Sequence, residues 1–215
     1  MNTSQIVAKI LLELKAVTLN TKTPFKYASG ILSPVYTDCR ILISFPKQRA
    51  IIRDLYIEEM QKTNAKFDCV AGTATAGIPH AAFIADKLNL PMIYVRGKAK
   101  DHGKGNQIEG KLESGQSVAV IEDLISTGES STESAKAINE VGAKAEYVFS
   151  IITYQMKTAD ENFKENNLKL ITLTTFEDVV DLAIKMSYIS QVEKETILDW
   201  IKNPNDWAKK NGFEE

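Results

Sequence analysis

Two adjacent carboxylates, Glu122 and Asp123, follow four apolar residues and precede a hydroxyl-rich turn of Ser126, Thr127 and Gly128. The apolar residues predict a buried strand, and the turn is expected to open a helix. Ligands of open α/β sheets bind beyond the carboxyl ends of the strands, and a helix N-terminus is a phosphate site. Paired carboxylates accept hydrogen bonds from vicinal sugar hydroxyls and can hold a hydrated Mg²⁺. The stretch therefore predicts a pocket for a ribose 5-phosphate group.

A second group of reactive side chains lies in a basic, glycine-rich stretch from Arg96 to Lys104 that includes Lys100 and His102. The stretch has few apolar side chains to bury, so we expect a mobile loop. A flexible cationic loop in an acidic protein is suited to closing over a highly charged anion. Its Lys and Arg donors would stabilise negative charge that develops on such an anion, and its His could serve as an acid.

The composition is that of a globular protein. The chain has 215 residues, of which 44% are apolar and 25% are charged, which suits a single domain. With 26 basic and 28 acidic residues the net charge is −2, which argues against general binding to nucleic acid or to an anionic membrane. No apolar stretch is long enough to span a bilayer, and the charged N-terminal run resembles an amphipathic helix more than a signal peptide. We expect a cytoplasmic protein without nucleic-acid or membrane partners.

The cysteines and the second histidine predict structural roles. The two cysteines, Cys39 and Cys69, fit no zinc-binding spacing and cannot form a disulfide framework. We expect buried or partly buried thiols in a reducing compartment. His80 follows Gly77-Ile-Pro and is expected to contribute to helix packing.

Strands and helices alternate between about residues 65 and 175, which predicts βαβ units and a mostly parallel central sheet flanked by helices. The expected strands are continuous apolar runs, as in a sheet covered on both faces. They cover residues 67–71, 91–96, 117–121, 145–153 and 168–173, with helices at 77–88, 130–141 and 159–167 and a long loop at 97–115.

The two ends of the chain lie outside this sheet and are expected to pack together over one of its edges. The N-terminal segment, about 1–62, is expected to build a small hood, and residues 176–215 a helical tail. The expected elements are a helix at 4–17 with Ser4 as its N-cap, a hairpin near Gly30, a helix from Pro46 that buries Ile51, Leu55 and Met60, helices at 176–186 and 191–201, and a turn near Trp207.

The stretch from Val118 to Ser131 resembles the signature with which type I phosphoribosyltransferases bind 5-phosphoribosyl 1-diphosphate (PRPP). It is neither a Walker A motif nor a dinucleotide fingerprint. The resemblance implies a type I phosphoribosyltransferase fold in which the carboxylates hold the ribose hydroxyls and Thr127 to Ser130 surround the 5-phosphate. The implied PRPP-binding residues in this stretch are Glu122, Asp123, Leu124, Ile125, Ser126, Thr127, Gly128, Glu129 and Ser130.

The basic loop is similar to the catalytic loop of the orotate phosphoribosyltransferase family, which Arg96, Lys100, His102 and Gly103 match position by position. Two further segments resemble the same family. Residues 28–40 look like its segment near the pyrimidine, and residues 72–79 look like its pyrophosphate loop. The resemblance therefore covers most of the chain.

This family transfers the phosphoribosyl group of PRPP to N1 of orotate and releases orotidine 5′-monophosphate and pyrophosphate, in pyrimidine biosynthesis. The resemblance implies that Lys100 and His102 are catalytic and bind PRPP together with Arg96, and that Ser126 contacts orotate. It implies a homodimer in which the 97–110 loop reaches the partner subunit's site. Mg²⁺ is expected as cofactor, held mainly by PRPP and water and not by protein ligands.

Three positions depart from the family pattern. Some members have Lys, Lys and Arg where this chain has Ala28, Ala76 and Tyr154. The departures concern individual orotate and pyrophosphate contacts and leave the reaction class intact. Lys98 is a candidate to replace one lost cation.

Other functions remain compatible with the motifs. The PRPP signature alone fits a purine or uracil phosphoribosyltransferase, although the basic loop and Ser33-Pro34 favour orotate. A regulator that senses PRPP without catalysis is a second possibility, because a fold does not determine function. A purely structural or partner-binding protein would leave both motifs unexplained.

Overall fold

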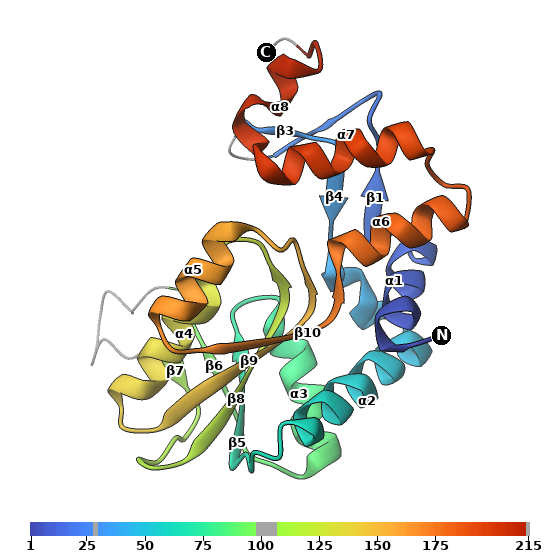
Figure 1. Ribbon diagram of the computed structural model, residues 1–215. Helices are drawn as coiled ribbons and strands as arrows, with labels where there is room; N and C mark the ends of the chain where they lie inside the picture. The colour runs from blue at the N-terminus through green and yellow to red at the C-terminus, as the bar shows by residue number, and fades with distance from the viewer. Residues whose placement is uncertain (28–29, 98–106, 214–215) are drawn as a thin grey trace. The chain divides into compact units, whose positions relative to one another are not determined.

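The computed structural model describes residues 1–27, 30–97 and 107–213. The chain divides into two compact units, each of which is described by itself (Figure 1). The larger unit consists of Ile43–Leu173, and the smaller unit combines Met1–Leu42 with Thr174–Glu215.

The larger unit is built around a six-stranded sheet with the strand order β10-β9-β8-β5-β6-β7. Strands β9, β8, β5 and β6 run parallel, and β7 pairs antiparallel with β6. The expected parallel sheet is thus confirmed. Its strands are β5 (Cys69–Thr73), β6 (Met92–Val95), β7 (Ile108–Glu109), β8 (Ser117–Ile125), β9 (Lys144–Thr153) and β10 (Lys169–Thr175).

Helices cover both faces of this sheet (Figure 1). Helices α2 (Pro46–Lys62) and α3 (Gly77–Leu88) pack against each other, and α3 lies on β5 and β8. Helix α4 (Glu129–Glu140) lies on β8 and β9 beside α5 (Lys157–Glu165). One apolar core joins Val120 of β8 with Ile138 of α4 and Phe163 of α5. Because both faces are buried, the strands are continuous apolar runs.

Among the expectations for the larger unit, those for the long loop and for the buried face of α2 were wrong. The stretch expected to be a long loop contains β7, because Arg96 donates its backbone N–H to the Gln107 carbonyl at 2.9 Å and continues the pairing of β6. In α2, Leu55 and Met60 are buried as expected, but Ile51 is 43% exposed and Ile52 is buried in its place. Ile52 lies three residues before Leu55 and therefore on the same helical face.

The smaller unit joins the two ends of the chain through packing of α1 (Thr3–Glu13) against α6 (Phe176–Lys185). The short strand β1 (Val17–Leu19) pairs with β4 (Val35–Thr37). The expected hairpin is formed by β2 (Phe25–Lys26) and β3 (Leu32–Ser33). The unit also contains α7 (Gln191–Lys202) and α8 (Pro204–Lys210), and a 3₁₀ helix at Cys39–Ser44 leads out of it.

Two expectations for the smaller unit also need correction. The N-cap of α1 is Asn2, whose side chain accepts the Gln5 N–H at 2.9 Å, and the Ser4 hydroxyl instead contacts Thr174 and Asp178. The turn expected near Trp207 is the helix α8, which begins at Pro204; Trp207 is buried and donates its indole N–H to the Thr196 carbonyl at 2.8 Å.

Across the described ranges, none of the helices has the length and apolar character needed to cross a bilayer. Cys39 and Cys69 are both buried thiols outside any disulfide, as expected. Burial raises the pKa of the Cys69 thiol to about 11.

Candidate active site

The candidate site lies at the carboxyl ends of three neighbouring parallel strands of the larger unit. The strands β6, β5 and β8 lie side by side in that order. The basic stretch follows β6, the segment resembling a pyrophosphate loop follows β5, and the turn after the two carboxylates follows β8. Since parallel strands end at the same edge of a sheet, Arg96 and the turns after β5 and β8 lie at one edge, where α/β proteins bind their ligands.

The turn after β5 is held by two close-packed glycines. A Cβ on Gly72 would lie 2.7 Å from the Ile78 Cα, and one on Gly77 would lie 2.3 Å from the Ile121 carbonyl oxygen. The N–H of Ala74 donates to the Val95 carbonyl at 2.9 Å, which ties the turn to β6. The Ala74–Thr75 peptide is cis. The glycine contacts bring the start of α3 directly against the backbone of Ile121 and Glu122 within β8.

The contact at Gly77 predicts a large loss of stability for Gly77→Ala. The new methyl group would meet backbone on β8, which cannot move aside as a flexible side chain does, and overpacking of this kind costs about 2 kcal/mol. Urea unfolding monitored by circular dichroism measures the effect. Gly97→Ala is the matched control, because a Cβ at Gly97 meets nothing within 4 Å. Equal stabilities of the two variants would contradict the packing argument.

The two adjacent carboxylates are not equivalent. Glu122 is only 7% exposed, and its two carboxylate oxygens accept hydrogen bonds from the Asp123 N–H and the Ser131 hydroxyl, both at 3.2 Å. Asp123 is half-buried, and one carboxylate oxygen accepts the Leu124 N–H at 2.8 Å. Glu122 faces α4, so Asp123 is the more accessible acid.

Burial raises the pKa of Glu122, and the neighbouring charge of Asp123 raises it further. The main chain at Glu122 is also fixed, because the buried Tyr56 of α2 donates its hydroxyl to the Glu122 carbonyl at 2.6 Å. The pair is therefore held from both faces of the sheet, by Ser131 on α4 and by Tyr56 on α2.

The turn after β8 presents hydroxyl groups at the start of α4. Thr127 and Ser130 are exposed and Ser126 is half-buried, whereas the side chain of Ile125 belongs to the core. Gly128 is the N-cap of α4 and has a φ of +78°, a conformation that glycine adopts at little cost. Helix N-termini carry unsatisfied N–H groups and a positive dipole end, so the turn is suited to an anion.

Of the basic stretch, only Arg96 and Gly97 belong to the described residues. Arg96 follows β6, and its guanidinium lies 3.6 Å from the Glu109 carboxylate of β7. The Arg96–Gln107 backbone hydrogen bond closes the stem from which the stretch extends. Lys98, Lys100, His102 and Gly103 lie outside the described residues, as does Ala28 of the N-terminal segment.

His80 is buried on α3, 3% exposed, with its ring centroid 6.3 Å from that of Tyr56. Among the described residues, its Nε2 has no hydrogen-bond partner. Burial lowers the pKa of His80 to about 4, so the imidazole is neutral near pH 7. This agrees with the packing role predicted for His80.

The lowered pKa of His80 predicts a loss of stability in acid. The unfolded chain takes up a proton on this side chain below pH 6.5, whereas the folded chain takes it up only near pH 4. Stability is therefore complete above pH 6.5, and the group destabilises the fold by about 2 kcal/mol at pH 5. Urea unfolding of wild type and His80→Leu at pH 8 and pH 5 tests this. Parallel losses in the two proteins would contradict the assignment.

The positions that depart from the family pattern have different surroundings. Ala76 is half-buried at the start of α3, and Tyr154 is only 4% exposed, with its N–H donating to the Ile125 carbonyl at 2.9 Å. In the smaller unit, Ser33 is fully buried and its hydroxyl bonds to Val35, whereas Tyr36 is 42% exposed. Tyr36 is thus the more available side chain of that segment.

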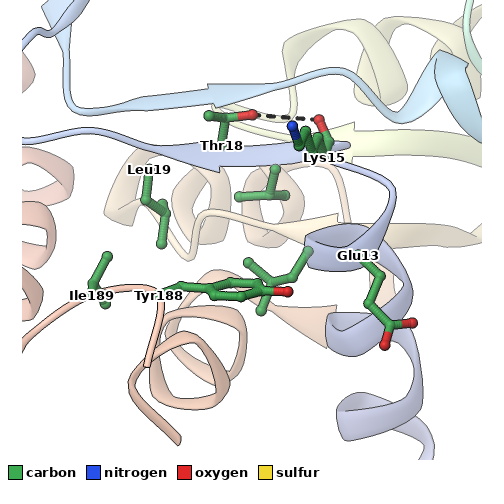
Figure 2. A pocket seen from close by; sticks show the side chains of 8 residues that line it. Glu13, Lys15, Thr18, Leu19, Tyr188 and Ile189 are labelled. Carbon is green, nitrogen blue, oxygen red and sulfur yellow. Dashed lines mark hydrogen bonds between the residues drawn. The ribbon is translucent and has the colours of Figure 1, made fainter. Parts of the chain in front are cut away.

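A separate cavity of about 380 Å³ lies wholly within the smaller unit (Figure 2). The aromatic ring of Tyr188 forms part of the cavity lining. The hydroxyl of Thr18, another lining residue, donates to the Lys15 carbonyl. None of its lining residues belongs to a motif that predicts chemistry. They are Leu12, Glu13, Lys15, Val17, Thr18, Leu19, Tyr188 and Ile189.

Within the described ranges, no three His, Cys, Asp or Glu side chains form a group that could hold a metal ion. The exposed edge of the Glu122–Asp123 pair offers carboxylate oxygens, the ligand type that Mg²⁺ prefers. Asp123, the more accessible of the two acids, would hold a hydrated ion, with water supplying most of its remaining ligands.

Comparison with known proteins agrees with this geometry. Residues 44–185 match the model of the phosphoribosyl transferase domain family. The orotate phosphoribosyltransferase of Coxiella burnetii is 47% identical over 96% of this chain and 99% of its own length. That of Listeria monocytogenes serotype 4b is 47% identical over 97% of this chain and its entire length. The crystal structure of orotate phosphoribosyltransferase from Aeropyrum pernix, 28% identical, superposes with a TM-score of 0.74 over 86% of this chain and 99% of that chain.

Sheet, signature turn and matched domain define a phosphoribosyltransferase of type I fold, an enzyme that transfers a pentosyl group. Sequence similarity to two bacterial relatives over nearly the full length of the chain identifies the family within this class of enzymes. The chain belongs to the orotate phosphoribosyltransferase family, enzymes of pyrimidine biosynthesis.

Several residues that shape the site were missed by sequence reasoning. Tyr56, Ser131, Asn162 and Phe163 each contact the acid pair or the turn after β8. Ser131 is the last residue of the stretch that resembles the signature, so its position was marked by the motif although its contact was not. The contacts of the other three span between 35 and 66 positions along the chain, and nothing in their local sequence marks them.

Proposed function

We propose that the carboxyl ends of β5, β6 and β8 bind PRPP and that the phosphoribosyl group passes to N1 of orotate, giving orotidine 5′-monophosphate and pyrophosphate. The observation that carries the proposal is the convergence of three anion-suited motifs at one edge of the sheet. Near-full-length similarity to enzymes named for orotate supports that base over purines and uracil, and supports catalysis over a regulatory role.

Each motif is assigned one part of PRPP. The turn from Thr127 to Ser130 at the start of α4 takes the 5-phosphate, and the more accessible Asp123 takes ribose hydroxyls beside Glu122. The turn after β5 and Arg96 take the pyrophosphate, together with Lys100 and His102. Ser126, which is half-buried and lies in the chain between Asp123 and Thr127, is assigned to orotate from the family resemblance.

The chain accelerates the reaction mainly by alignment and by charge stabilisation. The C1′–pyrophosphate bond breaks as N1 of orotate approaches from the opposite face, and positive charge develops on the ribose ring. Basic side chains at the end of β6 balance the charge of the leaving pyrophosphate, and closure over PRPP excludes water. When bound with PRPP, Mg²⁺ would neutralise pyrophosphate oxygens, with Asp123 the described residue best placed to contact its water shell.

The direct test is an assay of the purified protein with PRPP, Mg²⁺ and a panel of orotate, uracil, xanthine, hypoxanthine and adenine. Loss of each base and release of pyrophosphate are followed together. Consumption of orotate alone supports the proposal. Turnover of another base would overturn the choice of substrate, and binding of PRPP without any turnover would favour a sensor.

We further propose a cytoplasmic homodimer, in which both units of each chain form one catalytic domain and the 97–110 loop completes the partner subunit's site. A mixture of Lys100→Ala and Asp123→Asn chains tests the shared site. Each heterodimer would combine one intact loop with one intact acid pair, so random mixing should restore about a quarter of wild-type activity. Absence of any recovery, with dimers shown by ultracentrifugation, would place the loop in its own subunit's site.

A further inference from the structure

The last turn of α5 contacts the turn that follows β8. The Asn162 side chain of α5 donates its amide N–H to the Thr127 carbonyl at 2.8 Å. Its neighbour Phe163 is buried against Gly128, where a Cβ would lie 2.6 Å from the Phe163 Cε2. Helix α5 itself packs beside α4 (Figure 1). Two residues of α5, which lie outside the signature stretch, therefore hold the turn at Thr127 and Gly128.

Phe163 explains why position 128 must be glycine. A side chain there would collide with the ring, and the φ of +78° disfavours other residues independently. Glycine has a consequence for the peptide bond that precedes it. The Thr127–Gly128 peptide plane can rotate by half a turn, because glycine tolerates both signs of φ and turns interconvert in this way.

Asn162 selects one of the two orientations of this peptide plane. In a trans peptide the carbonyl and the following N–H point in opposite directions. Since the Thr127 carbonyl is turned toward α5 by Asn162, the Gly128 N–H is turned away from α5. The acceptor is a carbonyl oxygen, so only the NH₂ group of the amide can make this contact. Rotation of the plane would break the hydrogen bond and replace the N–H with a carbonyl that repels anions.

We propose that Asn162 is a positioning residue that keeps the Gly128 N–H aimed at the 5-phosphate of PRPP by holding the Thr127 carbonyl. The inference rests on the proposed function, because it takes this turn as the phosphate site. It adds a residue from α5, 35 positions away from Thr127 in the chain, to a site otherwise built from the signature. It also predicts a selective effect, on the 5-phosphate and not on pyrophosphate.

The test compares Asn162→Ala with the wild type in steady-state kinetics and in calorimetric binding. Loss of one hydrogen bond predicts a rise of about 3- to 10-fold in the KM for PRPP and in the Kd for ribose 5-phosphate. The Kd for pyrophosphate and the KM for orotate should change less than 2-fold. This split is not expected from a general loss of structure, which would weaken all ligands together.

Asn166→Ala is the matched control. Asn166 is also a half-buried amide of the α5 end, but its side chain donates to the Asn162 carbonyl at 2.7 Å within the helix. We expect its ribose 5-phosphate affinity to match that of the wild type. The same selective loss in both variants would mean that α5 stability is responsible and would overturn the proposal, as would an unchanged or uniform response of Asn162→Ala.

Failure of the proposed function gives a different result. If the wild type binds ribose 5-phosphate but converts no base, the reaction assignment fails while Asn162→Ala still tests the positioning role by calorimetry. If the wild type binds pyrophosphate but not ribose 5-phosphate, the turn is not the phosphate site and the role of Asn162 is overturned.

Discussion

Replacing Lys100 with alanine is expected to lower kcat by about 100- to 1000-fold, the usual effect of removing a charged group that acts on the transition state. The KM for orotate should change less than about 3-fold, because Lys100 is expected to stabilise the transition state and not the ground-state complex with orotate. The physical reason is that negative charge grows on the pyrophosphate only as the C1′–O bond breaks. Steady-state kinetics with both substrates varied measures the two constants separately.

The placement of the stem makes this expectation specific. Arg96 and Gln107 close the base of the basic stretch at the end of β6, next to the turn after β5. Lys111→Ala is a matched control, since it removes the same charge just beyond β7, where the exposed Lys111 pairs with Glu113 at 2.8 Å. We expect kcat of this variant to equal that of the wild type. A Lys100→Ala enzyme with wild-type kcat would refute the proposed role of the loop.

Much of the sheet could be predicted from the sequence because each strand is an apolar run bounded by a turn. Helix α3 begins and ends at the predicted residues, Gly77 and Leu88, since a short turn separates it from β5 and Asn89 terminates it in the left-handed conformation. The end of β8 was placed too early, at Ile121. The strand continues through Glu122 and Asp123 to Ile125 because β9 offers partners along this whole length.

The position of the candidate site could be predicted where its residues are consecutive in the sequence. The features that depend on tertiary contacts could not be predicted. The turn at the start of α4 was located from the apolar run, the two carboxylates and the hydroxyl-rich, glycine-containing residues that follow one another in the sequence. The difference between Glu122 and Asp123 was invisible, because strand alternation turns one side chain toward α4 and the other away, and only the packing of Ser131 shows which is buried. The hydrogen bond from Asn162 to the Thr127 carbonyl likewise could not be predicted, since it depends on where α5 packs.

A similar limit explains why the N-cap of α1 was placed at the wrong residue. Both Asn2 and Ser4 are good N-cap residues, and local sequence does not choose between them. Asn2 becomes the cap because Gln5 reciprocates in a capping box, which leaves the Ser4 hydroxyl to Thr174 and Asp178. Ser4, the residue predicted to be the N-cap, therefore makes tertiary contacts in place of a local capping hydrogen bond.

The unequal burial of the acid pair leads to the second large effect. Asp123→Asn is expected to lower kcat/KM for PRPP by about 10- to 100-fold, because hydrogen bonds from sugar hydroxyls to a charged acceptor contribute about 1.5 to 3 kcal/mol. Glu122→Gln should lower it less than about 5-fold, the range expected when hydrogen bonds are largely kept. Burial disfavours the charged form of Glu122, and an amide of the same length can keep the contacts to Ser131 and the Asp123 N–H.

The two isosteric variants control for each other, since each replaces one carboxyl oxygen with an amide NH₂ group on neighbouring residues of β8. Kinetics with PRPP varied at saturating orotate gives kcat/KM, and calorimetry with ribose 5-phosphate reports binding without turnover. If the carboxylates acted as an equal pair, both variants would lose the same factor. A greater loss in Glu122→Gln than in Asp123→Asn would mean that the buried acid turns toward the ribose when PRPP binds, at the expense of its hydrogen bond to Ser131.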